Sequence, residues 1–374
     1  MFSFIHSSDL HLGKRFGNFS GDLPGRLREA RHAVIARLAH HARDHGVMTI
    51  LLAGDTFDTE TPDPGVRRQA LAEMGYHAPI RWVILPGNHD SLQASQLWTT
   101  LKADAPENVI LAIEPKPIAL AADVVLLPSP CTARRPGRDL TEWMDSGVTP
   151  QGTIRIGLAH GAIQSFSEEG SGLDVIQPDR ARRAGLDYLA LGDWHGAVAV
   201  NPRTHYSGSP EPDRFKHNRP GGALLVTIAG SSAQPDVKPL ETASFSWRTL
   251  PLHVLVGDDP LPALATLLPD VRDRRQTLAR VEASGRCRLS VRAQLGSAID
   301  TAVPDFAYLE LYDSALATEC EAEDLDQIDR AGALREAANA LLAVAKDESR
   351  SIESRDIARA ALSRLFTYAL AVAP

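Results

Sequence analysis

Residues 2–13 read Phe-Ser-Phe-Ile-His-Ser-Ser-Asp-Leu-His-Leu-Gly, a short apolar run followed by a polar loop. The run Phe2–His6 predicts a buried β-strand, because it is short, rich in apolar residues and bounded by turn-forming ones. Asp9 and His11 are two positions apart, so in extended backbone their side chains point the same way. This order, an apolar strand and then a loop with polar side chains, recurs through residue 230 or so.

The same pattern predicts further strands at Met48–Ala53, Trp82–Leu85, Val124–Leu127, Ile154–Ala159, Tyr188–Leu191 and Ala223–Ile228. Between the first two strands lies Pro24–His45, where apolar residues recur at helical spacing, and Gly46 is a plausible helix stop. Strands that alternate with helices indicate an α/β layered domain.

After this domain the composition changes. Gly230–Pro239 is rich in Gly, Ser, Pro and Gln, which predicts a linker. Strands are then expected at Phe245–Val256, Thr277–Ala283 and Phe306–Tyr312, with a helix at Leu261–Leu268, and together they indicate a small α+β domain. Two amphipathic helices follow at about Ala331–Lys346 and Glu353–Ala371. The predicted domains are therefore 1–230, 240–315 and 320–374, and the apolar face of the last helix either packs on its own domain or binds a partner.

Composition excludes several classes of protein. The chain has 374 residues, of which 44% are hydrophobic and 23% charged, so it is neither fibrous nor disordered. It lacks an apolar run of 18 residues and a signal peptide, so we expect a cytoplasmic protein with no membrane contact. Its three widely spaced cysteines form no disulfide framework or thiolate zinc site. The net charge of −8 means that a polyphosphate substrate needs metal ions, a local basic patch or a partner.

Five clusters of polar residues follow five of the predicted strands. Their metal-binding members are Asp9, His11, Asp55, Asn88, His160, Asp193 and His195. Each cluster alone is weak, because a single Asp-x-His or a lone histidine is more often a loop or packing residue. Ligands of open α/β sheets gather at the carboxyl ends of strands, so five clusters in order form a strong joint signal.

Carboxylate, imidazole and amide ligands suit Mn²⁺, Fe²⁺ or Zn²⁺. Seven such ligands are too many for one ion and suit two ions that share a bridging carboxylate. Two metals about 3.5–4 Å apart can clamp the attacking and leaving oxygens of a phosphoryl displacement and activate water as hydroxide.

The ordered series D-x-H, G-D, G-N-H-D, H and x-x-H resembles the calcineurin-like metallophosphoesterases. Within that family, S-D-L-H-L-G at Ser8–Gly13, G-D-T-F-D at Gly54–Asp58 and Y-S-G-S-P at Tyr206–Pro210 are similar to the SbcD-type DNA repair exonuclease subunits. The resemblance covers roughly residues 1–230. It implies a layered sandwich of two central mixed sheets flanked by helices, followed by a small α+β capping domain and C-terminal helices.

The resemblance also implies roles for the site residues. The first metal is then held by Asp9, His11 and His195, the bridging carboxylate is Asp55, and the second metal takes Asn88, His160 and Asp193. His89 acts near the leaving group as an acid or charge stabiliser, and Asp90 orients its imidazole. Two divalent ions are implied, with Mn²⁺ preferred over Fe²⁺, Zn²⁺ or Mg²⁺.

One position departs from the family pattern. The closing motif is usually G-H-x-H, and here Asp193 stands in the place of the first histidine. Aspartate is shorter, adds a negative charge and prefers harder metals. We expect the second metal site to be retained with an altered metal preference, and loss of that ion is the competing outcome.

The function implied by the resemblance is DNA phosphodiester hydrolysis, exonucleolytic or endonucleolytic, by a metal-activated hydroxide. Arg134 and Arg135 in a basic loop, with Tyr206 and Ser207, are candidates for substrate binding. The implied partners are DNA, a second copy of the chain and an SbcC-like coiled-coil ATPase. Two other functions stay open: a phosphoesterase for cyclic nucleotides or nucleotide-linked small molecules, and a non-catalytic scaffold with a degraded metal site.

Overall fold

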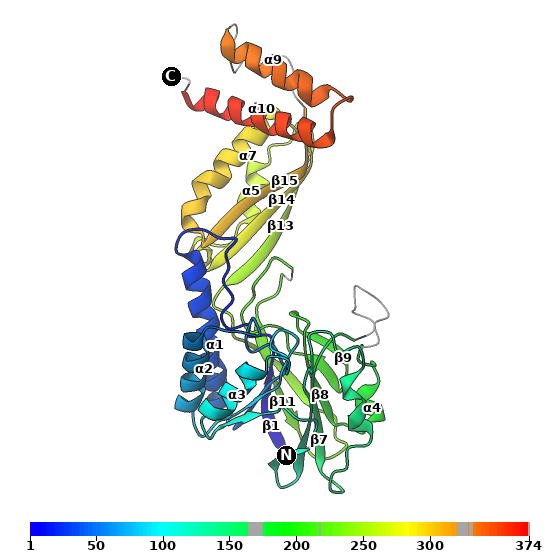
Figure 1. The fold of residues 1–374 in the computed structure, drawn as a ribbon. Helices are drawn as coiled ribbons and strands as arrows, with labels where there is room; N and C mark the ends of the chain where they lie inside the picture. Colours follow the sequence, from blue (N-terminus) through cyan, green and yellow to red (C-terminus); the bar gives the residue numbers. More distant parts are fainter. Residues whose placement is uncertain (164–174, 217, 320–327, 329–331, 373–374) are drawn as a thin grey trace. The chain divides into compact units, whose positions relative to one another are not determined.

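The computed structural model describes residues 1–163, 175–216, 218–319, 328 and 332–372 (Figure 1). The chain divides into two compact units, Met1–Ser246 and Trp247–Pro374. The first unit thus runs past the limit at residue 230 that composition indicates. Among the described helices, none has the length and apolar character needed to span a bilayer.

Two six-stranded mixed sheets form the centre of the first unit. The first sheet, in spatial order, consists of β12 (Asp236–Glu241), β11 (Gly222–Ile228), β1 (Phe2–Ser7), β2 (Thr49–Leu52), β3 (Arg81–Ile84) and β4 (Val109–Leu111). The second consists of β5 (Ile118–Ala121), β6 (Val124–Ser129), β7 (Ile154–His160), β8 (Tyr188–Gly192), β10 (Thr204–Tyr206) and β9 (Val198–Asn201). All seven strands predicted for this unit are present, with ends shifted by one or two residues.

The two sheets pack face to face. Successive residues of β1 point to opposite faces of its sheet. Phe4 packs between the sheets with Tyr188 of β8, whereas Ile5 packs against helices on the outer face. Because both faces are covered, central strands such as β2 and β8 are nearly continuous apolar runs and do not alternate with polar residues. The predicted fold, an α/β sandwich of two mixed sheets flanked by helices, is confirmed.

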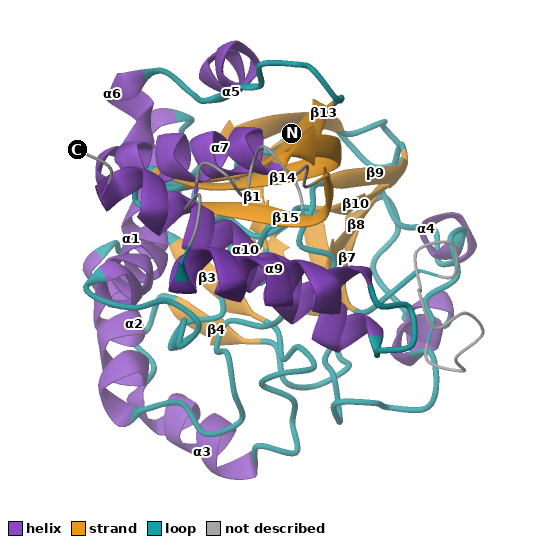
Figure 2. Cartoon of the chain, turned by 90° about the horizontal axis from the view of Figure 1, so that it is seen from above, coloured by secondary structure: helices purple, strands orange, loops and turns teal. Residues whose placement is uncertain are grey.

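Helices cover the outer faces of both sheets. Those of the first unit are α1 (Leu23–Asp44), α2 (Pro64–Tyr76), α3 (Ser95–Asp104), the 3₁₀ turn η1 (Leu140–Asp145) and α4 (Arg180–Arg183). Figures 1 and 2 show α1, α2 and α3 on one side of the strands and α4 on the other. α2 begins where the Asp63 side chain accepts a hydrogen bond from Gly65 N at 2.6 Å, with Pro64 at the first turn.

The stretch predicted as a linker contains a strand. β12 pairs antiparallel with β11, so that Val237 lies opposite Val226. It is an edge strand whose residues are mostly exposed and include Lys238 and Pro239. Edge strands carry such residues because only one side of their backbone is paired. The strand therefore lacks the apolar run by which buried strands are identified in a sequence.

The second unit contains a three-stranded sheet and helices. Its elements are β13 (Ser246–Val254), α5 (Leu261–Leu267), α6 (Val271–Arg274), β14 (Thr277–Arg288), α7 (Leu289–Ala302), η2 (Val303–Asp305), β15 (Tyr308–Glu319), α9 (Ala333–Lys346) and α10 (Ile352–Val372). The strands lie in the order β13-β14-β15, and β14 and β15 are parallel. The predicted segment 320–374 begins in residues outside the described ones, and its two helices are α9 and α10.

The last helix has a buried face and an exposed one. Leu362 and Phe366 of α10 are buried with Ala338 of α9 and Leu289 of α7. On the opposite side Ile357 is 63% exposed. One apolar face therefore packs within the unit, and other apolar side chains of α10 remain in contact with solvent.

Candidate metal centre

The predicted ligands lie in loops at the carboxyl ends of five strands. β1, β2 and β3 are adjacent and parallel in the first sheet, and β7 and β8 are adjacent and parallel in the second. Parallel neighbours end at the same edge of a sheet, so the loops that follow them meet there. Three loops therefore come from the first sheet and two from the second, and their side chains converge.

Strained backbone turns the ligands inward. Asp9, His11, Asp55 and Asp193 all have positive φ, at 55°, 45°, 53° and 101°. Residues other than glycine adopt this conformation rarely and at a cost, and such positions concentrate at functional sites. Hydrogen bonds hold the first two loops together, from His11 N to Asp55 O at 2.9 Å and from Asp9 N to Gly54 O at 3.1 Å.

Two glycines allow the loops to approach. A Cβ atom at Gly54 would lie 2.2 Å from His160 Nδ1, and one at Gly87 would lie 2.2 Å from Asp55 Oδ1. Neither distance is compatible with a side chain. The glycines of the G-D and G-N-H-D motifs are therefore required by close packing of the ligand-bearing loops.

One group of ligand atoms gathers around His11 and His195. The two Nε2 atoms are 3.2 Å apart, and His195 Nε2 lies 4.0 Å from Asp9 Oδ1. Ligand atoms of Asp9, His11 and His195 all lie within 4.8 Å of one another. This is the trio expected to hold the first metal.

A second group gathers around His160. Its Nε2 atom lies 3.5 Å from Asp55 Oδ2 and 3.8 Å from Asp193 Oδ1. Asn88 Nδ2 donates to the same Asp193 oxygen at 3.1 Å. Asp55 Oδ2 also lies 3.6 Å from His11 Nε2, which places this carboxylate between the two groups. The structure therefore brings all seven predicted ligands into one cluster.

The donor atoms fit divalent cations. His160 Nδ1 donates to Ala53 O at 2.8 Å, so in the neutral ring the other nitrogen, Nε2, carries the lone pair. This Nε2 and Asn88 Oδ1 are buried and form no hydrogen bond with any described residue. Buried polar atoms without partners are rare, and here both belong to predicted ligands. A set of imidazole, carboxylate and amide atoms suits Mn²⁺, Fe²⁺ or Zn²⁺.

The electrostatics of the cluster require a positive charge. Burial raises the pKa of Asp55, and the carboxylates of Asp90 and Asp9 raise it further. Burial alone would lower the pKa of His160, yet Asp55 and Asp9 raise it to about 9. A proton on His160 thus supplies part of the positive charge that these carboxylates need. A divalent cation would supply it instead when bound.

His89 and Asp90 lie at the centre with different partners from those expected. His89 N donates to Asp55 Oδ1 at 2.9 Å, and its Nδ1 lies 3.0 Å from the carbonyl oxygen of Asp58. The Asp90 carboxylate instead accepts hydrogen bonds from Gly87 N at 2.7 Å and Phe57 N at 3.0 Å. Asp90 therefore holds the loop backbone, and the Asp58 carbonyl orients the imidazole in its place.

Two aspartates that sequence reasoning did not single out support the ligand histidines. Asp58 Oδ1 lies 3.1 Å from His11 Nδ1, and Asp213 Oδ1 lies 3.2 Å from His195 Nδ1. In both pairs the carboxylate lies beside Nδ1 of the histidine, while Nε2 faces the cluster. Contacts of this kind fix the tautomer and orientation of a metal-binding histidine. Asp58 is the last residue of the G-D-T-F-D motif, so its place in that motif could have identified it as a candidate site residue. Asp213 is 18 residues from His195, and nothing in their spacing links them.

Cations surround the buried Asp213. Lys14 Nζ lies 2.9 Å from its carboxylate, Arg214 Nε 2.9 Å and Arg31 NH2 3.8 Å. Burial would raise the pKa of Asp213, but the hydrogen bond and charge of His195 and the charge of Arg31 hold it well below its usual value. Asp213 is therefore ionised, accepts a hydrogen bond from Arg214 Nε and lies against His195 Nδ1.

The predicted substrate-binding residues divide into two pairs. Arg134 and Arg135 are exposed in the loop after β6. Tyr206 and Ser207 are buried: the Tyr206 hydroxyl donates to Gly161 O at 2.8 Å, and the Ser207 hydroxyl lies 2.8 Å from that of Ser8. This corrects the expectation for Tyr206 and Ser207, because their hydroxyl groups hold the loops of the metal centre together.

A family model and two relatives match this chain. The family model described as calcineurin-like phosphoesterase matches residues 2–227. The SbcD subunit of the nuclease SbcCD from Escherichia coli K12 is 38% identical over 318 residues, covering 73% of this chain and 74% of that protein, and the protein of the same name from E. coli O157:H7 gives the same values. A solved crystal structure aligns over 63% of this chain and 98% of its own at 9% identity, with a TM-score of 0.38.

The family model covers more than half of the chain, and the two relatives match it over 74% of their own length. Both findings indicate the same family. This chain belongs to the calcineurin-like phosphoesterase family of metal-dependent hydrolases.

Proposed function

We propose that this protein is a divalent-metal-dependent phosphodiesterase that cuts DNA. The observation that carries the proposal is the convergence of seven ligand-type side chains at the carboxyl ends of five strands, beside a loop with exposed arginines. The similarity to the SbcD subunit of the nuclease SbcCD supports DNA as the substrate.

The assignment of the ligands follows the family resemblance and fits the contacts. Asp9, His11 and His195 would hold one cation, and Asn88, His160 and Asp193 the other. Asp55 lies within 3.6 Å of a histidine from each group. We propose Mn²⁺, with Fe²⁺, Zn²⁺ and Mg²⁺ as the other candidates. Such a pair of cations supplies Lewis acidity toward a phosphodiester and activates water for attack on phosphorus.

His89 is placed to handle the proton of the leaving oxygen. Its ring lies edge-on to that of His11, with centroids 4.9 Å apart. The Asp58 carbonyl can only accept, so Nδ1 of His89 carries a proton toward it. The orientation of the ring is thereby fixed. In the imidazolium form, with a proton on both ring nitrogens, Nε2 would donate its proton to the departing oxygen, and Nδ1 would keep the one that it shares with Asp58.

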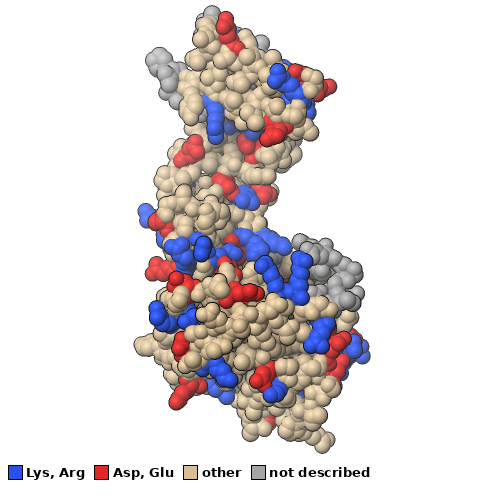
Figure 3. All heavy atoms as spheres, viewed as in Figure 1, with Lys and Arg blue, Asp and Glu red and all other residues tan. Residues whose placement is uncertain are grey.

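Exposed cations near the centre fit a phosphate backbone. Arg134, Arg135 and Arg138 lie in the loop after β6, at the same edge of the sheet as the ligands. None of the three forms an ion pair with a described residue. Figure 3 shows that Lys and Arg side chains gather on part of one face, although acidic residues outnumber them in the chain. A local basic group gives an acidic protein a way to hold a polyanion.

The test compares three substrates with the Mn²⁺-loaded protein: a single-stranded oligonucleotide, bis-p-nitrophenyl phosphate and cyclic AMP. We expect hydrolysis of the first two and a loss of about 100-fold or more in His89→Gln, because the leaving oxygen then lacks its acid. His40→Gln, which removes an exposed histidine from α1, is the matched control. Turnover of cyclic AMP with intact DNA would support the small-molecule alternative, and absence of both metal and hydrolysis would support the scaffold.

We further propose that the protein works as a homodimer with an SbcC-like coiled-coil ATPase. The exposed side chains Ile357 and Tyr368 of α10, at 63% and 69%, are eleven residues apart and so lie on one side of the helix. Unpartnered apolar side chains on one helix face fit a helical partner.

The double variant Ile357→Asp with Tyr368→Asp is expected to abolish co-purification with the ATPase. The control Val271→Asp, which changes an equally exposed residue of α6, is expected to leave co-purification unchanged. Retained binding in the double variant would place the ATPase elsewhere, and light scattering would report the dimer.

A further inference from the structure

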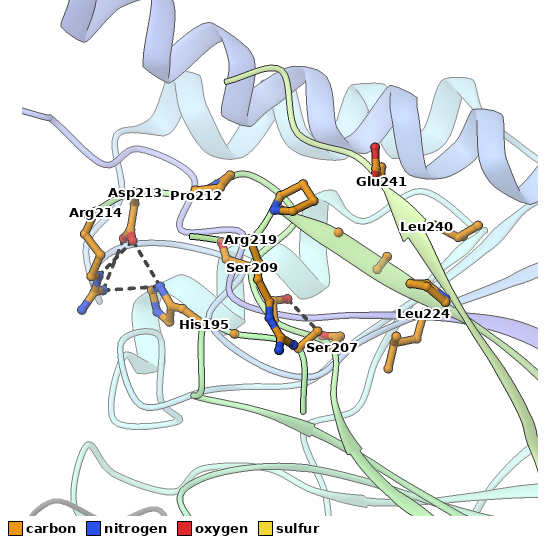
Figure 4. A pocket seen from close by; sticks show the side chains of 18 residues that line it. His195, Ser207, Ser209, Pro212, Asp213, Arg214, Arg219, Leu224, Leu240 and Glu241 are labelled. Carbon is orange, nitrogen blue, oxygen red and sulfur yellow. Dashed lines mark hydrogen bonds and ion pairs between the residues drawn. The ribbon is translucent and has the colours of Figure 1, made fainter. Parts of the chain in front are cut away.

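A cavity of about 350 Å³ adjoins His195 (Figure 4). Its volume is within the range of small-ligand pockets, about 300–1,000 Å³. Leu224 of β11 and Leu240 of β12 form one wall, and Pro212, Pro220 and Pro239 complete the apolar surface. No residue of this cavity other than His195 belongs to the predicted ligand set, so the metal centre does not account for it.

The opposite wall of the cavity consists of closely packed backbone. Gly208 has φ of 74°, and a Cβ there would meet Ala197 N at 2.7 Å. Ser209 N donates to His195 O at 3.0 Å, which ties this wall to the ligand histidine. The cavity is therefore formed by packed elements of the first unit, and its shape is largely set before any ligand binds.

One cation in the cavity has no partner. Arg219 is exposed and forms no ion pair or hydrogen bond with any described residue, whereas the neighbouring Arg214 is bound to Asp213. Figure 4 shows the Arg219 side chain pointing between His195 and Ser207. The carboxylate of Glu241 lies at the other end of the cavity. The end next to the metal ligand is thus positive and the walls are apolar.

This combination matches one unit of a nucleic acid. A base is a flat, largely apolar group, and a phosphate pairs with a guanidinium. The imidazole of His195 faces the cluster through Nε2 and also lines the cavity, so one molecule can reach both. We infer that the cavity binds the nucleotide adjacent to the scissile phosphodiester of single-stranded DNA, with Arg219 on the neighbouring phosphate. The inference rests on the proposed function.

The test measures binding of a fluorescent pentathymidylate with phosphorothioate linkages to the Mn²⁺-loaded protein at several salt concentrations. Arg219→Ala is expected to weaken binding about tenfold, the loss of one charge-assisted contact, and to reduce the slope of log K against log [salt] by about 0.7. Ala197→Trp is expected to weaken binding with little change in slope, because it fills volume and removes no charge.

Two controls match these variants. Arg182→Ala removes an exposed arginine of α4 that pairs with Asp179, and Ala199→Trp places the same bulk two residues along, outside the cavity. The inference is overturned if Arg219→Ala and Ala197→Trp bind like their controls while the wild type still binds and cuts DNA. A wild type that hydrolyses bis-p-nitrophenyl phosphate but neither binds nor cuts DNA overturns the proposed substrate, and the inference with it.

Discussion

Asp193 stands where the resemblance expects a histidine, and the structure places it among the candidate ligands. Its carboxylate is close to His160 and accepts a hydrogen bond from Asn88. Burial raises its pKa, which a bound cation would reverse. An aspartate here gives the second group two carboxylates, Asp55 and Asp193, and so favours cations with a stronger preference for oxygen.

Replacing Asp193 tests this directly. We predict that Asp193→Ala binds one metal ion per chain where the wild type binds two, and that its activity falls by about 100-fold. Asp193→His should restore two ions and shift preference toward Zn²⁺. Metal analysis by mass spectrometry gives the count, and Asp179→Ala, at an exposed aspartate of the same unit, is the control. Two ions in Asp193→Ala would remove this residue from the ligand set.

His160 links metal binding to pH. In the cation-free chain its pKa is raised from 6.5 to about 9, so its protonated form stabilises the folded state. That contribution is fully present below pH 6.5 and is lost as the pH rises through 9. A cation needs the neutral imidazole, so we predict that binding at pH 7.5 releases about one proton and that affinity rises with pH up to about 9.

Calorimetry in Hepes and Tris, whose ionisation enthalpies differ, would measure the proton released. The His160→Asn variant should release about one proton fewer, and His40→Gln should behave like the wild type. Equal proton release in wild type and His160→Asn would show that the proton comes from another group.

Sequence reasoning singled out the seven side chains that meet in the cluster because each lies at the end of an apolar strand in a short motif. It did not find Asp213, because the contact with His195 depends on how the loop after β10 folds back, and it misassigned Asp90. A carboxylate next to His89 in sequence is a natural candidate to orient it, yet the backbone donors of Gly87 and Phe57 occupy that carboxylate. Adjacent residues in a tight loop point in different directions, which the motif alone does not show.

At the scale of elements, the loops meet only because glycines leave room. We predict that Gly54→Ala destabilises the first unit by more than about 3 kcal/mol, since it combines a forced contact with a positive φ. Gly152→Ala also has a positive φ but meets no atom within 4 Å, so it should cost only about 1 kcal/mol. Chemical denaturation of both variants measures the difference. Equal costs would mean that the loops can separate freely.

The elements that the sequence did not reveal share a physical cause. β12 is an exposed edge strand, and α7, which was not predicted, follows β14 with no turn residue between them. Strong periodicity arises from burial on a fixed face, so buried strands and the long α1 were predictable. Elements with mixed exposure or without a clear boundary form because of tertiary pairing. That pairing cannot be predicted from local composition.

At the scale of the molecule, the candidate metal ligands come from both sheets of the first unit and from no described residue of the second. Bound cations would therefore stabilise one unit only. At a hundredfold excess over Kd each ion adds about 2.7 kcal/mol, so two ions should raise the Tm of Met1–Ser246 by about 10 °C or more.

Removal of metal by EDTA should lower this transition and leave the one of Trp247–Pro374 in place, as scanning calorimetry would show. Readdition of Mn²⁺ is the control for irreversible damage. A parallel shift of both transitions would indicate that the units unfold together.

The mixed donor set has a consequence for any sample of this protein. Imidazole and carboxylate groups bind first-row cations in a general order that places nickel and copper above manganese, so strength of binding does not select manganese. Protein eluted from a nickel resin will carry nickel away with it. The ion found in a purified sample therefore depends on how the protein was purified. The physiological ion has to be identified by removing all metal and then adding competing cations at their cellular ratios.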